Sequence, residues 1–125
     1  MVDASEAQAR PASDCLFCKI AAGAIPSEKL HDDGTVFVIA DINPQAPVHL
    51  LVIPFEHLTS VAAVGANNAS LMRNMTMLAN EAAKAAGVAK SGYRLVMNTG
   101  PEGGQSVAHL HMHVLGGRQL SGQMG

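Results

Sequence analysis

Aromatic residues are scarce in this sequence, and tryptophan is absent. Aromatic side chains make up 3% of the 125 residues, so aliphatic side chains and seven methionines have to fill the interior. No apolar run approaches the roughly 18 residues that a membrane-spanning helix needs, which argues against a membrane partner. The first thirteen residues also lack the apolar segment of a secretory signal, so we expect a cytoplasmic protein.

Charge of one sign is not concentrated anywhere either. Eight Lys and Arg residues against ten Asp and Glu residues give a formal net charge of −2, without a basic cluster. This balance argues against binding of a nucleic-acid polymer. The length predicts one domain with a modest core. We expect a flexible arm at residues 1–13, the domain at 14–118 and a loose tail at 119–125.

Cysteine is limited to Cys15 and Cys18. Two thiols this close together, in a chain for which we expect no leader, are more typical of reduced or metal-binding cysteines than of a structural disulfide. The sequence leaves two interpretations open. The two cysteines are either part of a metal site or two small apolar thiols buried beside the sheet.

The periodicity of apolar residues predicts an α+β fold with an antiparallel sheet, one short helix and one long helix. The short helix is expected from Cys15 to about position 22, with Asp14 as its N-cap. The long helix is expected from Asn67 or Asn68 to about position 86, and its stripe of Leu, Met and Ala predicts a core or a subunit interface. Strands are expected at 28–31, 35–40, 49–53 and 93–98, and in a last stretch that ends near Leu115.

Three histidines, His109, His111 and His113, alternate with apolar residues near the C-terminal end. Alternation is typical of a strand and places the three imidazoles on one face, about 6.5 Å apart. That spacing is too wide for direct contact between them, but it suits the lining of a small anionic ligand. The pattern alone leaves open a solvated strand face, a metal site or nucleophilic chemistry at phosphorus.

The histidine run resembles the signature of the histidine triad (HIT) superfamily, and other stretches resemble its Hint branch, the histidine triad nucleotide-binding proteins. Those stretches are 41–54, 92–94 and 103–107. The resemblance covers about residues 14–118. It implies a sheet of about five strands per subunit, a homodimer with a continuous sheet, and a purine nucleotide as ligand (AMP, GMP or their phosphoramidates).

The resemblance also implies roles for the histidines. His111 matches the nucleophile, whose second ring nitrogen donates its N–H to a backbone carbonyl of the motif. The product would be a nucleotidyl–histidine that water hydrolyses. His109 and His113 flank the nucleophile, with His113 hydrogen-bonded to a phosphate oxygen, and His49 is implied as a partner behind them. Ser106 offers its hydroxyl to the phosphate or to the leaving group.

The nucleotide itself is expected to contact several other stretches. Asp41 matches the carboxylate that accepts the ribose hydroxyls. Gly104, Gln105 and Ser106 are expected to present backbone N–H groups to an anion, as in a nest. The other expected nucleotide contacts are Leu16, Phe17, Ile20, Ile42 and Asn98.

The cysteine pair departs from many Hint proteins. Other HIT branches carry such a pair as half of a structural zinc site, and the implied ligands here are Cys15, Cys18, His49 and His109. Two buried thiols without zinc are the alternative, and no cofactor is expected to be required for catalysis.

Three functions compete at this point. The first is hydrolysis of purine nucleoside phosphoramidates through His111. The second is hydrolysis of dinucleoside polyphosphates or nucleotidyl transfer, as in other HIT branches. The third is nucleotide binding without catalysis. The stretch 103–107 and the glycine pair at 116–117 favour the first, and the complete triad with Ser106 argues against the third.

Overall fold

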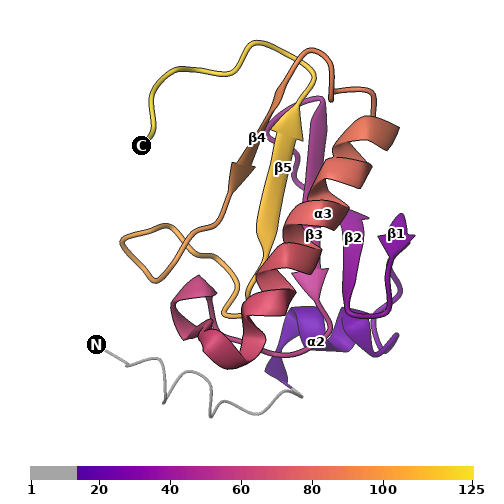
Figure 1. Ribbon diagram of the computed structural model, residues 1–125, viewed down its shortest axis with the longest axis vertical. Coiled ribbons are helices and arrows are strands. Elements are labelled where there is room, and N and C mark those ends of the chain that lie inside the picture. The colour runs from indigo at the N-terminus through magenta and orange to yellow at the C-terminus, as the bar shows by residue number, and fades with distance from the viewer. Residues whose placement is uncertain (1–13) are drawn as a thin grey trace.

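Five strands form one antiparallel sheet in the order β1-β2-β3-β5-β4 (Figure 1). The computed structural model describes residues 14–125, so the arm expected at 1–13 lies outside the described residues. The fold therefore agrees with the predicted α+β class. The strands are β1 (His31–Asp32), β2 (Val36–Ala40), β3 (Val48–Pro54), β4 (Tyr93–Val96) and β5 (Met112–Gly116).

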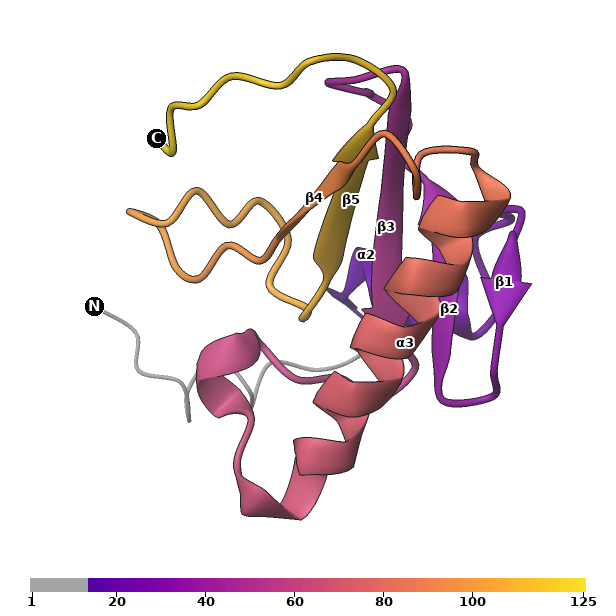
Figure 2. The ribbon, with the colours of Figure 1, turned by 45° about the horizontal axis from the view of Figure 1, so that its top comes forward.

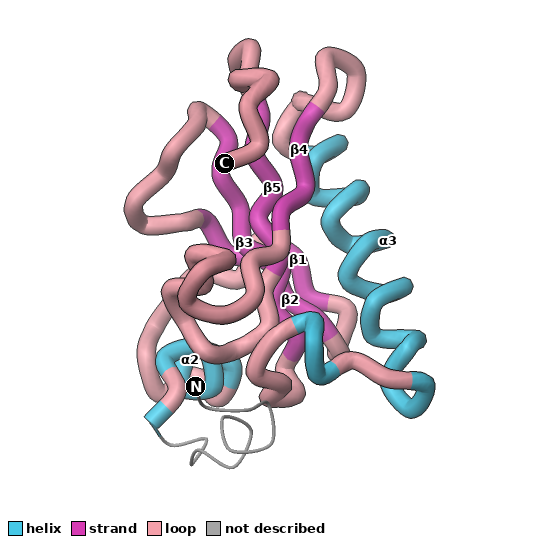
Figure 3. Tube along the Cα trace, turned by 90° about the vertical axis from the view of Figure 1, so that its left-hand side faces the viewer, coloured by secondary structure: helices cyan, strands magenta, loops and turns pink. Residues whose placement is uncertain are grey.

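The two α-helices within residues 14–125 lie on opposite faces of the sheet, as Figure 3 shows. They are α2 (Leu16–Ala21) and α3 (Ala69–Ala85), and two short 3-10 helices, η2 (Val61–Ala63) and η3 (Ala66–Asn68), precede α3. Among residues 14–125, no helix combines the length and the apolar character that crossing a membrane requires.

The long helix α3 covers the face of the sheet opposite to the histidine site. Its apolar stripe is buried against β2, β3 and β5. The stripe predicted from the sequence is thus core, and it does not need a second subunit to cover it. Its buried members are Leu71, Met75, Leu78, Ala79, Ala82 and Ala83.

The short helix α2 begins one residue later than expected. Its N-cap is Cys15, whose Sγ accepts the backbone N–H of Cys18 at 3.4 Å, and not Asp14. A thiol is a weak acceptor, but this geometry keeps both sulfur atoms at the same end of the helix. The start of α2 therefore brings the two thiols together.

The first strand is shorter than predicted. The strand consists of His31 and Asp32, with one more backbone bond from the Leu30 N–H to the Val38 carbonyl, so the strand expected at 28–31 was wrong in its range. Lys29 turns toward α2, where its Nζ donates to the Ile20 carbonyl at 3.2 Å. The residues before Leu30 therefore connect α2 to the sheet and do not extend it.

The histidine segment is a regular strand only from Met112 onward. Before it, the Leu110 N–H donates to the Leu58 carbonyl at 2.7 Å. His109 and His111 thus precede β5. The alternation still holds, because Leu110, Met112 and Val114 are buried on the α3 face while the rings of His109 and His111 contact Phe17 of α2. After β5 the C-terminal residues leave the sheet on its β4 side (Figure 2).

Candidate active site

A cavity of about 340 Å³ lies on the α2 face of the sheet. Its walls are mainly apolar, and no Lys or Arg of the described residues lines it. Its polar lining is limited to Ser27, Asp41, Ser106, His111 and His113. The cavity also brings together four apolar residues that the sequence predicted for nucleotide contact, namely Leu16, Phe17, Ile20 and Ile42.

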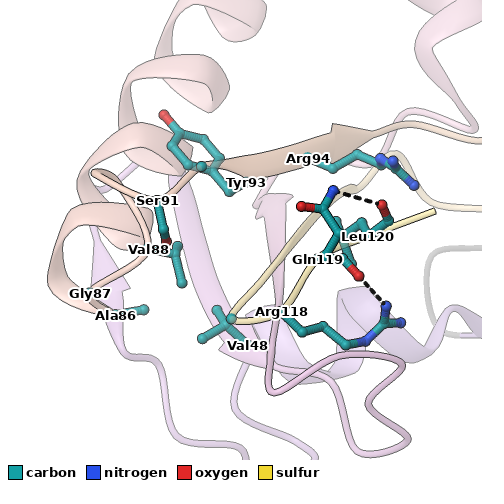
Figure 4. A pocket seen from close by; sticks show the side chains of 12 residues that line it. Val48, Ala86, Gly87, Val88, Ser91, Tyr93, Arg94, Arg118, Gln119 and Leu120 are labelled. Carbon is teal, nitrogen blue, oxygen red and sulfur yellow. Dashed lines mark hydrogen bonds between the residues drawn. The ribbon is translucent and has the colours of Figure 1, made fainter. Parts of the chain in front are cut away.

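A larger cavity, of about 710 Å³, lies elsewhere, between the end of α3, the start of β4 and the tail (Figure 4). Arg94 and Arg118 line it, but none of the predicted site residues does. Figure 4 shows that Arg118 is already hydrogen-bonded to the Gln119 carbonyl. The chemistry-bearing residues therefore single out the smaller cavity as the candidate site.

His111 is held in one tautomer by its own backbone segment. Its Nδ1 lies 2.7 Å from the carbonyl oxygen of His109, which can only accept a hydrogen bond. Nδ1 therefore carries the proton, and Nε2 keeps the lone pair that attacks an electrophile. Burial lowers the pKa of His111, against the opposing effects of the His109 carbonyl and Asp41. The residue is thus a neutral imidazole near pH 7.

His113 takes part in a row of three side chains. Its Nδ1 lies 2.9 Å from Nε2 of His49, and that Nε2 lies 3.3 Å from Oδ2 of Asp41. The rings of His111 and His113 have their centroids 5.1 Å apart at 63°, so they touch edge to face. The expectation that the histidines are too far apart for direct contact was wrong, because the rings lean toward each other.

The glycine-rich loop uses its N–H groups internally. The N–H of Gly104 donates to the Pro101 carbonyl, and the N–H of Gln105 donates to the Gly100 carbonyl. A Cβ on Gly103 would collide with the carbonyl oxygen of Thr99, which shows how tightly the loop turns. Gly104 and Gln105 do not line the cavity, so the arrangement differs from the expected nest.

Side chains hold this loop closed. The amide nitrogen of Gln105 donates to the carbonyls of Thr59 and Val107, and its oxygen accepts the Gly100 N–H. Asn98 donates to the Gly103 carbonyl at 2.8 Å and does not line the cavity. Among the expected phosphate contacts of the loop, Ser106 alone reaches the cavity.

A second cluster lies beside the site and contains the cysteine pair. Its members are Cys15, Cys18, His57 and His109, whose ligand atoms all lie within 4.8 Å of one another. His49 lies elsewhere, grouped with Asp41 and His113. The fourth member is therefore His57, which the sequence analysis missed, and not His49, which the resemblance implied.

The register of the sheet explains why His57 lies there. β3 and β5 are antiparallel, and Val52 faces Met112. Residues that follow β3 must therefore approach residues that precede β5, and Nε2 of His109 lies 2.9 Å from the Pro54 carbonyl. The same register, continued for three residues, places Phe55 opposite His109, and His57 lies two residues further along the chain.

The cluster has the dimensions of a tetrahedral zinc site. Zinc bonds of about 2.05 Å to nitrogen and 2.3 Å to sulfur give N–N edges of about 3.3 Å and N–S edges of about 3.6 Å. The two Nδ1 atoms of His57 and His109 are 3.2 Å apart, and three N–S distances are 3.2, 3.3 and 3.5 Å. Burial, followed by the Cys15 thiol, raises the pKa of Cys18 to about 11, so a Cys18 thiolate here needs a cation.

His109 is oriented toward this cluster by its second nitrogen. Nε2 donates to the Pro54 carbonyl, so Nδ1 presents a lone pair to the thiols and to His57. Burial lowers the pKa of His109 to about 4, which keeps the ring neutral. The same residue offers its backbone carbonyl to His111. The cysteine–histidine cluster therefore holds His109 in place, and the backbone carbonyl of His109 in turn fixes the tautomer of His111.

The folded protein is expected to lose stability as the pH falls from 6.5 toward 4. Burial, followed by the neighbouring His111 and His49, lowers the pKa of His113 to about 4 from its usual 6.5. In that window the unfolded chain binds a proton at this position and the folded chain does not, so the free energy of unfolding falls with pH. Denaturant unfolding of His113→Gln should show a shallower pH dependence than the wild type. His31→Gln, on the strand at the other end of the sheet, is the control, and equal slopes for all three proteins would contradict the prediction.

Comparison with known proteins connects this geometry to a family. A family model described as the HIT domain matches residues 22–120. The purine nucleoside phosphoramidase of Escherichia coli K12 is 43% identical over 109 residues, which are 87% of this chain and 92% of that protein. Protein HitA of Neisseria gonorrhoeae is 44% identical over 103 residues, which are 82% of this chain and 95% of that protein. The structure of a HIT family hydrolase from Clostridium thermocellum superposes with a TM-score of 0.86 at 42% identity, covering 89% of this chain and 96% of the other. This chain belongs to the HIT domain family.

Proposed function

We propose that this protein hydrolyses purine nucleoside phosphoramidates, with His111 as the nucleophile. The observation that carries the proposal is the 2.7 Å hydrogen bond from Nδ1 of His111 to the His109 carbonyl, because it leaves Nε2 unprotonated. Similarity to relatives described as HIT family hydrolases supports a hydrolase activity, and the phosphoramidase of E. coli supports the P–N bond as its target.

The cavity suits a nucleotide of this kind. Its apolar walls, to which α2 contributes three residues and the turn after β2 contributes Ile42, offer a surface for the base. Asp41 offers a carboxylate oxygen to the ribose hydroxyls. His113 and Ser106 are the side chains that can hydrogen-bond the phosphate and the leaving group, since both line the cavity together with His111.

The reaction then proceeds in two displacements. Nε2 of His111 attacks phosphorus, the P–N bond breaks, and the nitrogen takes a proton through Ser106, so that a neutral amine leaves. Water next attacks the phosphorus of the nucleotidyl–His111 intermediate, and the bond from phosphorus to Nε2 breaks. The proton that water loses replaces the one passed through Ser106 to the amine. The nucleoside monophosphate leaves, and His111 returns to its neutral form. The first step needs His111 neutral before attack, which its burial favours.

Turnover of adenosine 5′-phosphoramidate tests this function directly. Release of ammonia and AMP in equal amounts by the purified protein is the expected result. Diadenosine polyphosphate as the preferred substrate would instead assign the protein to nucleotidyl chemistry between phosphates. AMP binding without turnover of either substrate would make it a binding protein.

We also propose a structural zinc ion at Cys15, Cys18, His57 and His109, which supplies rigidity and no chemical step. Protein prepared without added metal or a His tag is expected to contain about one zinc per subunit by metal analysis. His57→Gln should lose the zinc, because it removes one of four converging ligand atoms. His31→Gln changes a histidine outside the cluster and should retain it. A folded wild-type protein without zinc would favour two buried thiols.

A homodimer is the assembly we propose. β4 stands at one end of the sheet with β5 on its inner side, so its outer backbone groups are open among the described residues. Leu95 of β4 is 37% exposed, and Met77 of α3, which is 57% exposed, lies one helical turn before Asn80, the residue that accepts the hydrogen bond of the Tyr93 hydroxyl. Pairing of the β4 edges of two subunits would cover both of these side chains and join the two sheets. Light scattering at micromolar concentration should give twice the mass of the chain, and a monomer would contradict the proposal.

A further inference from the structure

The imidazole of His49 lies between two groups to which the proposed function gives separate tasks. Its Nε2 is 2.9 Å from Nδ1 of His113, next to the phosphate position, and 3.3 Å from Oδ2 of Asp41, at the ribose position. His49 is buried and does not line the cavity, so it acts on the substrate only through these neighbours.

A backbone amide decides where His49 carries its proton. The N–H of Gln45 donates to Nδ1 of His49 at 3.0 Å, so Nδ1 is an acceptor and has no proton. The single proton of the ring is therefore on Nε2. That one donor faces two acceptors, which are His113 and Asp41.

The choice between the two acceptors sets the state of His113. When the His49 proton points to His113, Nδ1 of His113 accepts it and the proton of His113 itself is on Nε2. His113 then presents an N–H donor from Nε2. When the ring tilts so that this N–H points to Asp41 instead, Nδ1 of His113 loses its donor and both tautomers of His113 become accessible. Asp41 is a strong competitor because it is charged, and the Asn43 N–H satisfies only its other oxygen, Oδ1, at 2.8 Å.

We propose that His49 is a positioning residue that couples ribose binding at Asp41 to the tautomer of His113. This inference rests on the proposed function. Ribose hydroxyls donate hydrogen bonds to the Asp41 carboxylate, so Oδ2 of Asp41 competes less with His113 for the His49 proton. The proton then stays on the side of His113, and His113 offers its Nε2–H to the phosphate. The ribose hydroxyls therefore raise kcat and do not only lower KM.

Kinetics with and without the hydroxyls test the coupling. With the wild type, kcat for adenosine 5′-phosphoramidate should exceed kcat for its 2′,3′-dideoxy analogue by about tenfold, beyond any change in KM. In Asp41→Asn the competing charge is gone, so the two kcat values should agree within about twofold. Asp32→Asn removes one charge on β1 and should keep the wild-type ratio. A wild-type ratio near one, with the hydroxyls acting in KM alone, would overturn the inference.

Variants of His49 separate positioning from packing. His49→Phe keeps a ring without a donor, so kcat should fall and should no longer respond to the hydroxyls. His49→Gln restores an N–H donor and should recover part of both the rate and the response. A His49→Gln protein as slow as His49→Phe and equally unresponsive, with both folded, would assign His49 to packing.

Nitrogen-15 NMR of histidine-labelled wild type makes the test independent of turnover. With saturating AMP, His113 should show a protonated Nε2 and an unprotonated Nδ1, and with 2′,3′-dideoxy-AMP it should show mixed tautomers. The same mixture with both ligands, or a proton on Nδ1 of His113 with AMP, would overturn the coupling. If these spectra agree with expectation but no phosphoramidate is turned over, the proposed function fails and the coupling stands.

Discussion

His111→Ala is expected to lower kcat for adenosine 5′-phosphoramidate by at least about 10⁴-fold and to change AMP binding by no more than about tenfold. The nucleophile stabilises the transition state, whereas the apolar walls and Asp41 bind the nucleotide before the reaction. Single-turnover kinetics and calorimetric binding of AMP measure the two effects separately.

The control for this substitution is His31→Ala, which removes a histidine from β1 and leaves the site intact. It should retain wild-type kcat and wild-type binding. Turnover by His111→Ala within about tenfold of the wild type would remove His111 from the nucleophilic role. A loss of binding as large as the loss of rate would assign His111 to ground-state contacts.

The second large effect concerns the leaving group. We expect kcat/KM for adenosine 5′-phosphoramidate to exceed that for a diadenosine polyphosphate by at least about a hundredfold, roughly 2.7 kcal/mol of transition-state discrimination. A phosphate leaving group brings additional negative charge into the cavity. No Lys or Arg of the described residues lines that cavity, and its one charged group, Asp41, is itself negative. An amine leaves neutral once it is protonated, so it needs no such compensation.

Ser106 should contribute to this preference. Ser106→Ala should slow the phosphoramidate more than the dinucleotide, because it removes the hydroxyl that passes a proton to the amine. Ser70→Ala, on the exposed side of α3, is the matched control and should change neither rate. Comparable rates of wild type on the two substrates, measured side by side, would contradict the expected preference.

Local patterns were sufficient to predict most of the fold. The stripe of α3 defined the helix to within about a residue at each end, because it is amphipathic and followed by Gly87 with a φ of 82°. The range of β1 and the start of β5 were not predictable in this way. Both depend on tertiary contacts, which are the bond from Lys29 to α2 and the bond from Leu110 to Leu58.

The site was predictable where it depends on side-chain alternation and less so where it depends on the path of the backbone. Alternation placed His111 and His113 on one face, and both line the cavity. The loop glycines suggested free N–H groups, but whether such groups point to a ligand or back into the loop is decided by Gln105, whose amide bridges three backbone groups. The pairing of β3 with β5 brings only the neighbourhood of His57 to His109, because it places Phe55 opposite His109.

Trapping of the intermediate tests the central claim most directly. Wild-type protein is mixed with adenosine 5′-phosphoramidate, quenched within one turnover under conditions that preserve phosphohistidine, and digested for mass spectrometry. We predict an adenylyl group on the peptide that contains His111, absent from the His111→Ala protein treated in the same way. Turnover of the substrate with no adenylylated peptide at any time, or with the adenylyl group on another residue, would contradict it.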